Sequence, residues 1–185
     1  MKKVLWAVFV AASAALIMTF VPLPATTTSQ ATHTVTYDVA CDGNTFTLNR
    51  QDVSMTEKIK RGDTFVLNGK IYPGGTIPSG GTRTEPSSFG PESAGSIGTW
   101  FCSGSFLVGS EKFDKEKIQR ATTHFFALND KNRIVTEGFE GSTETSRVVL
   151  GGVGQYYNAH GLVSMERIGI NATGAYNMRF TFNLE

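Results

Sequence analysis

The sequence has few of the side chains that build metal centres or activated nucleophiles. Among its 185 residues there are three histidines and two cysteines. The histidines, His33, His124 and His160, are scattered and show no Cys/His or carboxylate spacing typical of a metal site. No Gly-x-Ser-x-Gly motif is present, so a serine hydrolase is not supported. We therefore expect no bound metal.

The sequence also lacks an excess of charge of either sign. It contains 17 basic and 16 acidic residues, mixed along the chain without a basic stripe or a charge block. Nucleic acids and anionic membrane surfaces are bound through concentrated positive charge. Neither is expected as a partner of this chain.

The first 31 residues have the pattern of a signal peptide. Lys2 and Lys3 precede an uncharged apolar run over 4–25, and Ser29-Gln30-Ala31 offers a cleavage site of small residues. Cleavage after residue 25 is a second option, and an uncleaved membrane anchor is the rival interpretation. We expect a secreted or periplasmic protein with no stable membrane insertion after cleavage. The mature chain would carry 15 basic and 16 acidic side chains.

The two cysteines, Cys41 and Cys102, form an even count in a chain expected to be exported. Disulfides form in such oxidising compartments, which favours a Cys41–Cys102 bridge. The alternative is a free Cys102 thiol that faces a cavity.

Alternation of apolar and polar side chains predicts eight strands. No segment shows a sustained helical period of apolar residues. Short connections force antiparallel neighbours, and eight such strands can close and remove their edges. We predict an all-β fold, an eight-stranded antiparallel barrel over residues 45–185 that follows a leader at 32–44, with a two-sheet sandwich as the alternative. The predicted strands are Thr45–Met55, Thr64–Tyr72, Ile97–Val108, Lys117–Leu128, Arg133–Glu140, Thr145–Leu150, Leu162–Ile168 and Ala175–Asn183.

Two connections stand out between these strands. The first is a turn over 150–161 whose glycines permit positive φ and close approach of the backbone; they are Gly151, Gly152, Gly154 and Gly161. We expect them to form a structural turn between neighbouring strands. The second is the Gly-, Pro- and Ser-rich segment 73–96, whose length is typical of a functional lid or a mobile loop.

Several short motifs occur in an order that resembles the allene oxide cyclase and dirigent barrels. The match covers roughly residues 45–184, and a bacterial dirigent-like exported protein fits better than a true allene oxide cyclase. The motifs are Gly62–Tyr72 for the second strand, Gly98-Thr99-Trp100-Phe101-Cys102 for the third, Ile134-Val135-Thr136-Glu137-Gly138 for the fifth, the glycine turn, and the aromatic strand Tyr176–Leu184.

This resemblance implies an eight-stranded barrel, often a homotrimer, with an apolar pocket at one end and no metal or organic cofactor. Such barrels hold a reactive, mostly apolar molecule in one conformation while it cyclises or couples. The expected partner is a small hydrophobic molecule, and any enzymatic activity would be that of a cofactor-independent cyclase or isomerase. The alternative is a non-catalytic binding or surface protein that uses the loop 73–96 for recognition.

The resemblance also suggests site residues. The second-strand match directs Phe65, Leu67 and Gly69 into the cavity, and Cys102 falls near the pocket cysteine of the family. Glu140 falls approximately at a pocket tyrosine of the cyclases. Burial would raise the pKa of the Glu140 carboxyl and suit it to acid–base catalysis, whereas a solvated strand end is its ordinary role.

Three further residues are candidates for ligand binding from their place in the predicted strands. Arg50, with Asp52, is placed to bind an oxyanion at the barrel mouth, or to form a surface ion pair. Tyr72 precedes the long loop and could donate to a ligand from the rim or cap the core. Phe125 belongs to an aromatic strand segment beside His124.

Overall fold

The computed structural model describes residues 33–50, 58–115, 117–141 and 145–185, so the expected signal peptide lies outside the described residues. The described chain forms eight strands and two short 3₁₀ helices. The strands are β1 (His33–Leu48), β2 (Thr64–Pro73), β3 (Gly98–Phe106), β4 (Ile118–Ala127), β5 (Arg133–Gly141), β6 (Thr145–Val153), β7 (Gly161–Ile170) and β8 (Tyr176–Leu184). The 3₁₀ helices are η1 (Ser110–Lys112) and η2 (Gly154–Tyr156).

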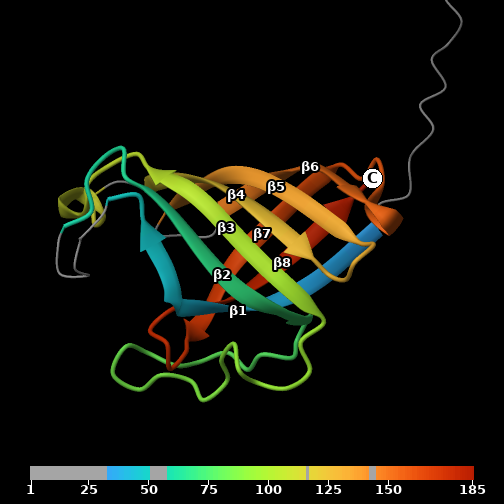
Figure 1. Ribbon diagram of the computed structural model, residues 1–185, viewed down its shortest axis with the longest axis horizontal. Helices are drawn as coiled ribbons and strands as arrows, with labels where there is room; N and C mark the ends of the chain where they lie inside the picture. Colours follow the sequence, from blue (N-terminus) through green and yellow to red (C-terminus); the bar gives the residue numbers. More distant parts are fainter. Residues whose placement is uncertain (1–32, 51–57, 116, 142–144) are drawn as a thin grey trace, which may run out of the picture.

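The strands close into one antiparallel barrel in chain order, with β8 paired to β1 (Figure 1). This confirms the predicted fold class. Each strand pairs with two neighbours, so no edge is left to attract another chain. None of the helices in the described residues has the length and apolar character needed to cross a bilayer.

The barrel begins earlier than the expected boundary at residue 45. β1 starts at His33, which pairs with Leu184, and its first half continues along β8 as far as the pair Ala40–Asn177. Closure requires this pairing, because β8 would otherwise be an unpaired edge. The register of β1 with β2 then shifts between Asp42 and Thr47, where the strand turns sharply at one end of the barrel (Figure 1).

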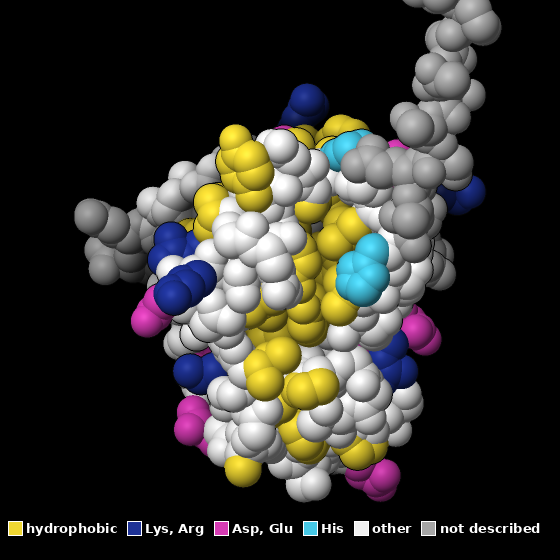
Figure 2. All heavy atoms as spheres, turned by 90° about the vertical axis from the view of Figure 1, so that its right-hand side faces the viewer, with side chains coloured by type: hydrophobic (Ala, Val, Ile, Leu, Met, Phe, Trp, Pro, Cys, Tyr) yellow, Lys and Arg dark blue, Asp and Glu magenta, His cyan; other side chains and the backbone are white. Residues whose placement is uncertain are grey.

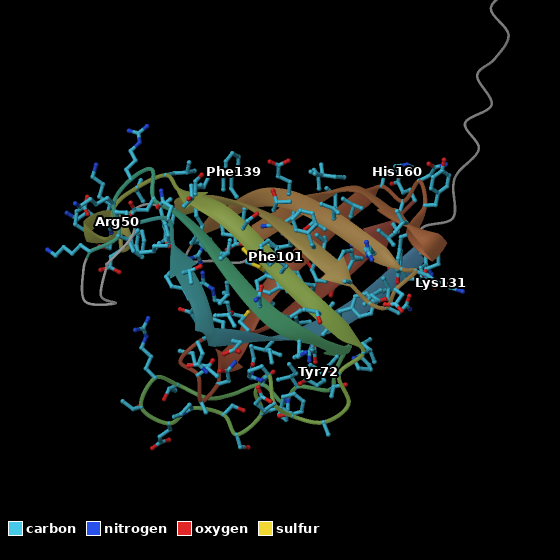
Figure 3. The ribbon with its side chains drawn as sticks, viewed as in Figure 1. Arg50, Tyr72, Phe101, Lys131, Phe139 and His160 are labelled. Carbon is cyan, nitrogen blue, oxygen red and sulfur yellow. The ribbon has the colours of Figure 1, made fainter. Side chains whose placement is uncertain are left out.

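Alternate side chains of each strand point inward and form one core. It is rich in aromatic rings, as in the edge-on contacts of Phe126 with Phe180 and with Phe182, whose centroids lie 5.0 and 5.1 Å apart. The end of the barrel near Lys131 and His160 (Figure 3) is filled with packed side chains. Figure 2 looks toward this end and shows hydrophobic side chains gathered across its middle.

Two buried tyrosines help to seal that end. The hydroxyl groups of Tyr37 and Tyr156 are 2.5 Å apart, and the Tyr37 ring packs edge-on against Phe182. Burial and this hydrogen bond raise the pKa of Tyr37 well above its usual value. The Tyr37 hydroxyl therefore stays protonated, and the core on this side holds no charge from it.

Three glycines of the β6–β7 connection, Gly152, Gly154 and Gly161, lie where the backbone is crowded. Gly151 and Gly152 precede Val153, the last residue of β6, while Gly154 opens η2 with φ +69° and Gly161 opens β7 with φ +134°. A Cβ at Gly154 would lie 2.3 Å from the Lys131 carbonyl oxygen, and its φ is one that L side chains resist. This position therefore needs glycine for both space and conformation.

Residues 74–97, which connect β2 to β3, form a fixed strap along the outside of β1, β7 and β8 (Figure 1). Ile77 is buried against the barrel, and its N–H donates to the carboxylate of Asp38 at 2.9 Å. Arg179 donates to the same carboxylate through two nitrogens, and Asn177 donates to the carbonyl of Phe89. These buried contacts hold the strap against the wall, and a functional lid or a mobile loop stays a prediction for this segment.

Candidate functional site

A cavity of ≈ 390 Å³ lies inside the barrel at the end opposite His160 and Lys131. Its wall is mainly apolar and includes two methionines and several aromatic rings. The lining residues are Cys41, Gly43, Phe46, Phe65, Leu67, Arg83, Trp100, Cys102, Arg120, Glu140, Met165, Arg167, Thr173, Gly174, Ala175, Tyr176 and Met178.

A buried polar cluster forms one side of this cavity. The carboxylate of Glu140 accepts from Arg120 Nε at 2.8 Å through one oxygen. Its other oxygen accepts from the Thr122 hydroxyl at 2.7 Å and from Arg147 Nη1 at 3.1 Å. His124 Nε2 lies 2.8 Å from this same oxygen. Four side chains therefore converge on one carboxylate inside an otherwise apolar barrel.

The strand alternation explains how the cluster is assembled. Arg120, Thr122 and His124 occupy successive inward positions of β4, and Arg120 pairs directly with Glu140 across the β4–β5 ladder. Arg147 enters from β6. On β5, which lies between β4 and β6, Gly138 occupies an inward position, and a Cβ there would lie 3.0 Å from Arg147 Cγ. Gly138 thus leaves the space that the long guanidinium side chain crosses.

Arg147 is fully buried, yet most of its donors are used. Its guanidinium donates to the Thr122 hydroxyl at 2.7 Å, the Thr122 carbonyl at 2.6 Å and the Thr136 hydroxyl at 3.2 Å, besides Glu140. Burial lowers the pKa of Arg147 while the Glu140 charge raises it. Because a guanidinium group loses its proton only at very high pH, Arg147 stays a buried cation that depends on its carboxylate partner.

Glu140 is held as a carboxylate. Burial alone would raise its pKa, but the contacts with His124, Arg120 and Arg147 outweigh it and hold the pKa well below its usual range. The expected raised pKa is therefore wrong in direction, and so is the solvated strand end, since the side chain is buried. An ionised Glu140 has no proton to give at neutral pH. Its chemistry is to orient and neutralise the cations beside it.

His124 is the neutral member of the cluster. Burial lowers its pKa to about 4, although the neighbouring carboxylate raises it. Its ring packs edge-on between Trp100 and Phe180, with centroids 4.8 and 5.5 Å away. Neither ring nitrogen makes a well-aligned hydrogen bond to a described residue, so the 2.8 Å approach to Glu140 is a close contact off the ideal line.

Cys102, His124 and Glu140 also place one sulfur, one nitrogen and one oxygen within 4.8 Å of one another. This donor set is of a kind that binds Zn²⁺. However, Glu140 is already paired with two arginines, and a dication there would be repelled by both guanidinium groups at short range in a medium of low polarity. We interpret the group as part of an ion-pair network.

The expected Cys41–Cys102 disulfide is wrong, because both cysteines are free and buried. Cys41 pairs with Gly69 and Cys102 with Leu67, so the two cysteines lie on β1 and β3 with β2 between them. Two strand spacings separate their backbones by about 9–10 Å, beyond the roughly 7 Å that a disulfide spans. Both thiols line the cavity, and burial raises the pKa of each.

Only some of the sequence-based candidates meet at the cavity. Phe65, Leu67, Cys102 and Glu140 line it. Gly69 lies outside the lining, at a position where a Cβ would be 2.7 Å from the Ala40 carbonyl oxygen.

The other candidates lie elsewhere. Tyr72 points away from the core and donates to the strap at the carbonyl of Ser93 at 2.9 Å. Phe125 is on the outer face, in ring contact with Phe101. Arg50 forms an ion pair with Asp63 at 3.0 Å beyond the cavity lining.

Sequence reasoning missed the arginines of the site. Arg147 occupies an inward position of the alternating segment 145–150. A charged residue where the alternation predicts an apolar core side chain is the signal that could have revealed it. Arg120 and Arg167 occupy similar inward positions of β4 and β7. Arg167 Nη2 donates to the Gly141 carbonyl at 2.6 Å, and its guanidinium lies 4.5 Å from the centre of the Tyr176 ring.

The fold and this cavity define an eight-stranded barrel with an internal apolar cavity, and the same fold occurs in solved proteins. A pyocyanin demethylase matches 83% of this chain and 100% of its own length, at 13% identity and a TM-score of 0.53. Two pterocarpan synthase dirigent proteins match with TM-scores of 0.54 and 0.52, at 9% and 8% identity. They cover 92% and 84% of this chain and 98% and 94% of their own chains.

No family model matches the sequence, and no curated protein is similar to it in sequence. At these low identities the structural neighbours establish the fold alone. The chain has the barrel of the dirigent proteins, as its motifs predicted.

Proposed function

We propose that this chain binds a small hydrophobic molecule in the barrel cavity and directs its cyclisation or stereoselective coupling. The observation that carries the proposal is the cavity itself, ≈ 390 Å³ in volume and mainly apolar, at one end of a barrel whose other end is packed. This volume lies in the range of small-molecule sites. The structural neighbours are named for chemistry on small organic molecules, pyocyanin demethylation and pterocarpan synthesis.

The chemistry would rest on confinement and on one polar side of the wall. Aromatic and sulfur-containing side chains exclude water and restrict the conformations of an apolar guest, which favours one ring closure or coupling face. Arg120, fixed by Glu140, presents a cation to negative charge that develops on the guest.

A cavity-filling variant tests this function. Leu67→Trp places a large ring in the cavity, while Val66→Trp makes the same change at the adjacent, outward-facing position of β2. We expect wild-type protein and Val66→Trp to bind 2-acetylnaphthalene, an apolar probe, in isothermal titration calorimetry, and Leu67→Trp to lose binding at least tenfold. Equal binding by both variants would place the probe outside the cavity and remove the basis of the proposal.

We also propose a homotrimer that forms through the outer face of β3–β7. This face carries exposed Phe125, Leu150 and Leu162, whose exposed fractions are 42%, 56% and 55%. Exposed apolar side chains on the outside of a barrel are what such an interface would cover. Light scattering on the wild type and on Leu162→Lys would test it: a trimer that the substitution dissociates supports the assembly, and a wild-type monomer refutes it. Recognition through the loop 73–96 stays a prediction.

A further inference from the structure

The wall of the cavity carries more positive than negative charge. Among the described lining residues, Arg83, Arg120 and Arg167 are basic and Glu140 alone is acidic. Glu140 is further paired with the buried Arg147, behind the wall. The negative charge at the site is therefore already neutralised inside the protein, and the remaining guanidinium groups face a mostly apolar space.

Arg120 is the cation best placed to meet a ligand. Its Nε donates to Glu140, which fixes the plane of the guanidinium group, and its side chain is 20% exposed where it lines the cavity. No described residue accepts a hydrogen bond from its two terminal nitrogens within hydrogen-bond distance. A guanidinium fork held on one edge presents its other donors in a geometry that suits a planar oxyanion.

The other two arginines line the same cavity as Arg120. The backbone carbonyl of Gly141 and the Tyr176 ring hold Arg167 on the β7 side. Arg83 comes from the strap and is an exposed lining residue. Cations from three separate segments thus surround one cavity, and in an apolar site their attraction for an anion is stronger than in water.

We infer that the molecule bound here has an apolar body and one anionic oxygen, a carboxylate or an enolate, and that Arg120 is the residue that pairs with it. This inference rests on the proposed function and defines its substrate class. A neutral guest of the same shape would fill the cavity but leave the Arg120 donors unpaired. An anion would gain a charge-assisted hydrogen bond, which corresponds to about tenfold to hundredfold in affinity.

Two matched pairs of probes test the inference at neutral pH by calorimetry on the whole chain. The carboxylate pair is 2-naphthoate and its neutral analogue 2-acetylnaphthalene; the enolate pair is 4-hydroxycoumarin and 4-methoxycoumarin. We expect the anion of at least one pair to bind ten times or more tighter than its neutral partner. Arg120→Met should remove that preference, and its circular dichroism spectrum reports whether the variant is folded. Arg133→Met, at the far end of β5, is the control and should change neither.

The outcomes separate this inference from the function beneath it. If neutral and anionic probes bind equally well to the wild type, or if Arg120→Met keeps the preference, the anionic ligand is refuted while hydrophobic binding stands. If none of the four probes binds, the proposed function itself fails. Should Arg120→Met not fold, the wild-type comparison still decides the charge preference, and Arg120→Lys tests whether the fork geometry is needed: it should retain part of the preference.

Discussion

Replacing Glu140 by glutamine should destabilise the barrel strongly. The carboxylate accepts from Arg120, Thr122 and Arg147, and Arg147 is buried with no other described acid bonded to it. An amide of nearly the same shape removes the charge but not the volume, so the loss is electrostatic. Removing one partner of a buried ion pair costs about 3–5 kcal/mol. We expect a loss of that size in the free energy of unfolding.

The assay is urea unfolding followed by circular dichroism, with Glu137→Gln as the control. Glu137 is exposed on the outer face of the same strand, so its substitution should change the unfolding free energy by less than about 0.5 kcal/mol. The double variant Glu140→Gln with Arg147→Met removes both charges. It should recover much of the stability that Glu140→Gln loses, because no unpaired cation remains in the core.

Two results would refute this reasoning. If Glu140→Gln costs less than about 1 kcal/mol, the carboxylate does not hold the buried cation. If the double variant loses more unfolding free energy than the two single variants lose together, Glu140 and Arg147 do not compensate each other's charge.

Three further predictions concern other parts of the molecule. The pKa of His124 is about 4 in the fold and about 6.5 when unfolded, so its contribution to the unfolding free energy should be complete above pH 6.5 and fall by up to about 3 kcal/mol as the pH drops toward 4. His124→Gln should flatten that part of the pH profile of urea unfolding, and a profile unchanged by the substitution would contradict a buried neutral ring. Alkylation of unreduced, denatured protein should label Cys41 and Cys102, and a single mass without added label would contradict the free thiols. Tyr72→Phe should lower the unfolding free energy by about 1 kcal/mol and speed amide hydrogen exchange in the strap. Exchange at the wild-type rate in this variant would contradict the anchoring role of the Tyr72 hydroxyl. We also propose export, for which N-terminal sequencing of the released protein should find residues 1–31 removed.

Much of the fold could be predicted because period-2 alternation fixes both the strands and their inward faces. The alternation placed Phe65 and Leu67 on one side of their strand, the family resemblance directed that side into the cavity, and both residues line it. Tyr72 shows the limit of the rule. It lies on the outward phase, yet it is buried, because the strap covers that part of the wall. A covering segment cannot be read from the alternation of the strand beneath it.

The polar cluster was harder to predict because it is assembled across three strands. Glu140 alone suggested a raised pKa, and only the pairing of β4, β5 and β6 brings Arg120 and Arg147 onto it and reverses the direction. The prediction of a disulfide was wrong for a related reason. Compartment and cysteine count favour a bridge, but the placement of β2 between β1 and β3 separates Cys41 from Cys102.

A crystal structure of the protein soaked with 2-acetylnaphthalene would test the central claim most directly. We predict electron density for the probe inside the barrel, in contact with Leu67, Trp100 and Met178 and beside the Arg120–Glu140 pair. A cavity filled by repacked side chains, with the probe bound only on the outer face, would contradict a barrel built to hold a hydrophobic guest.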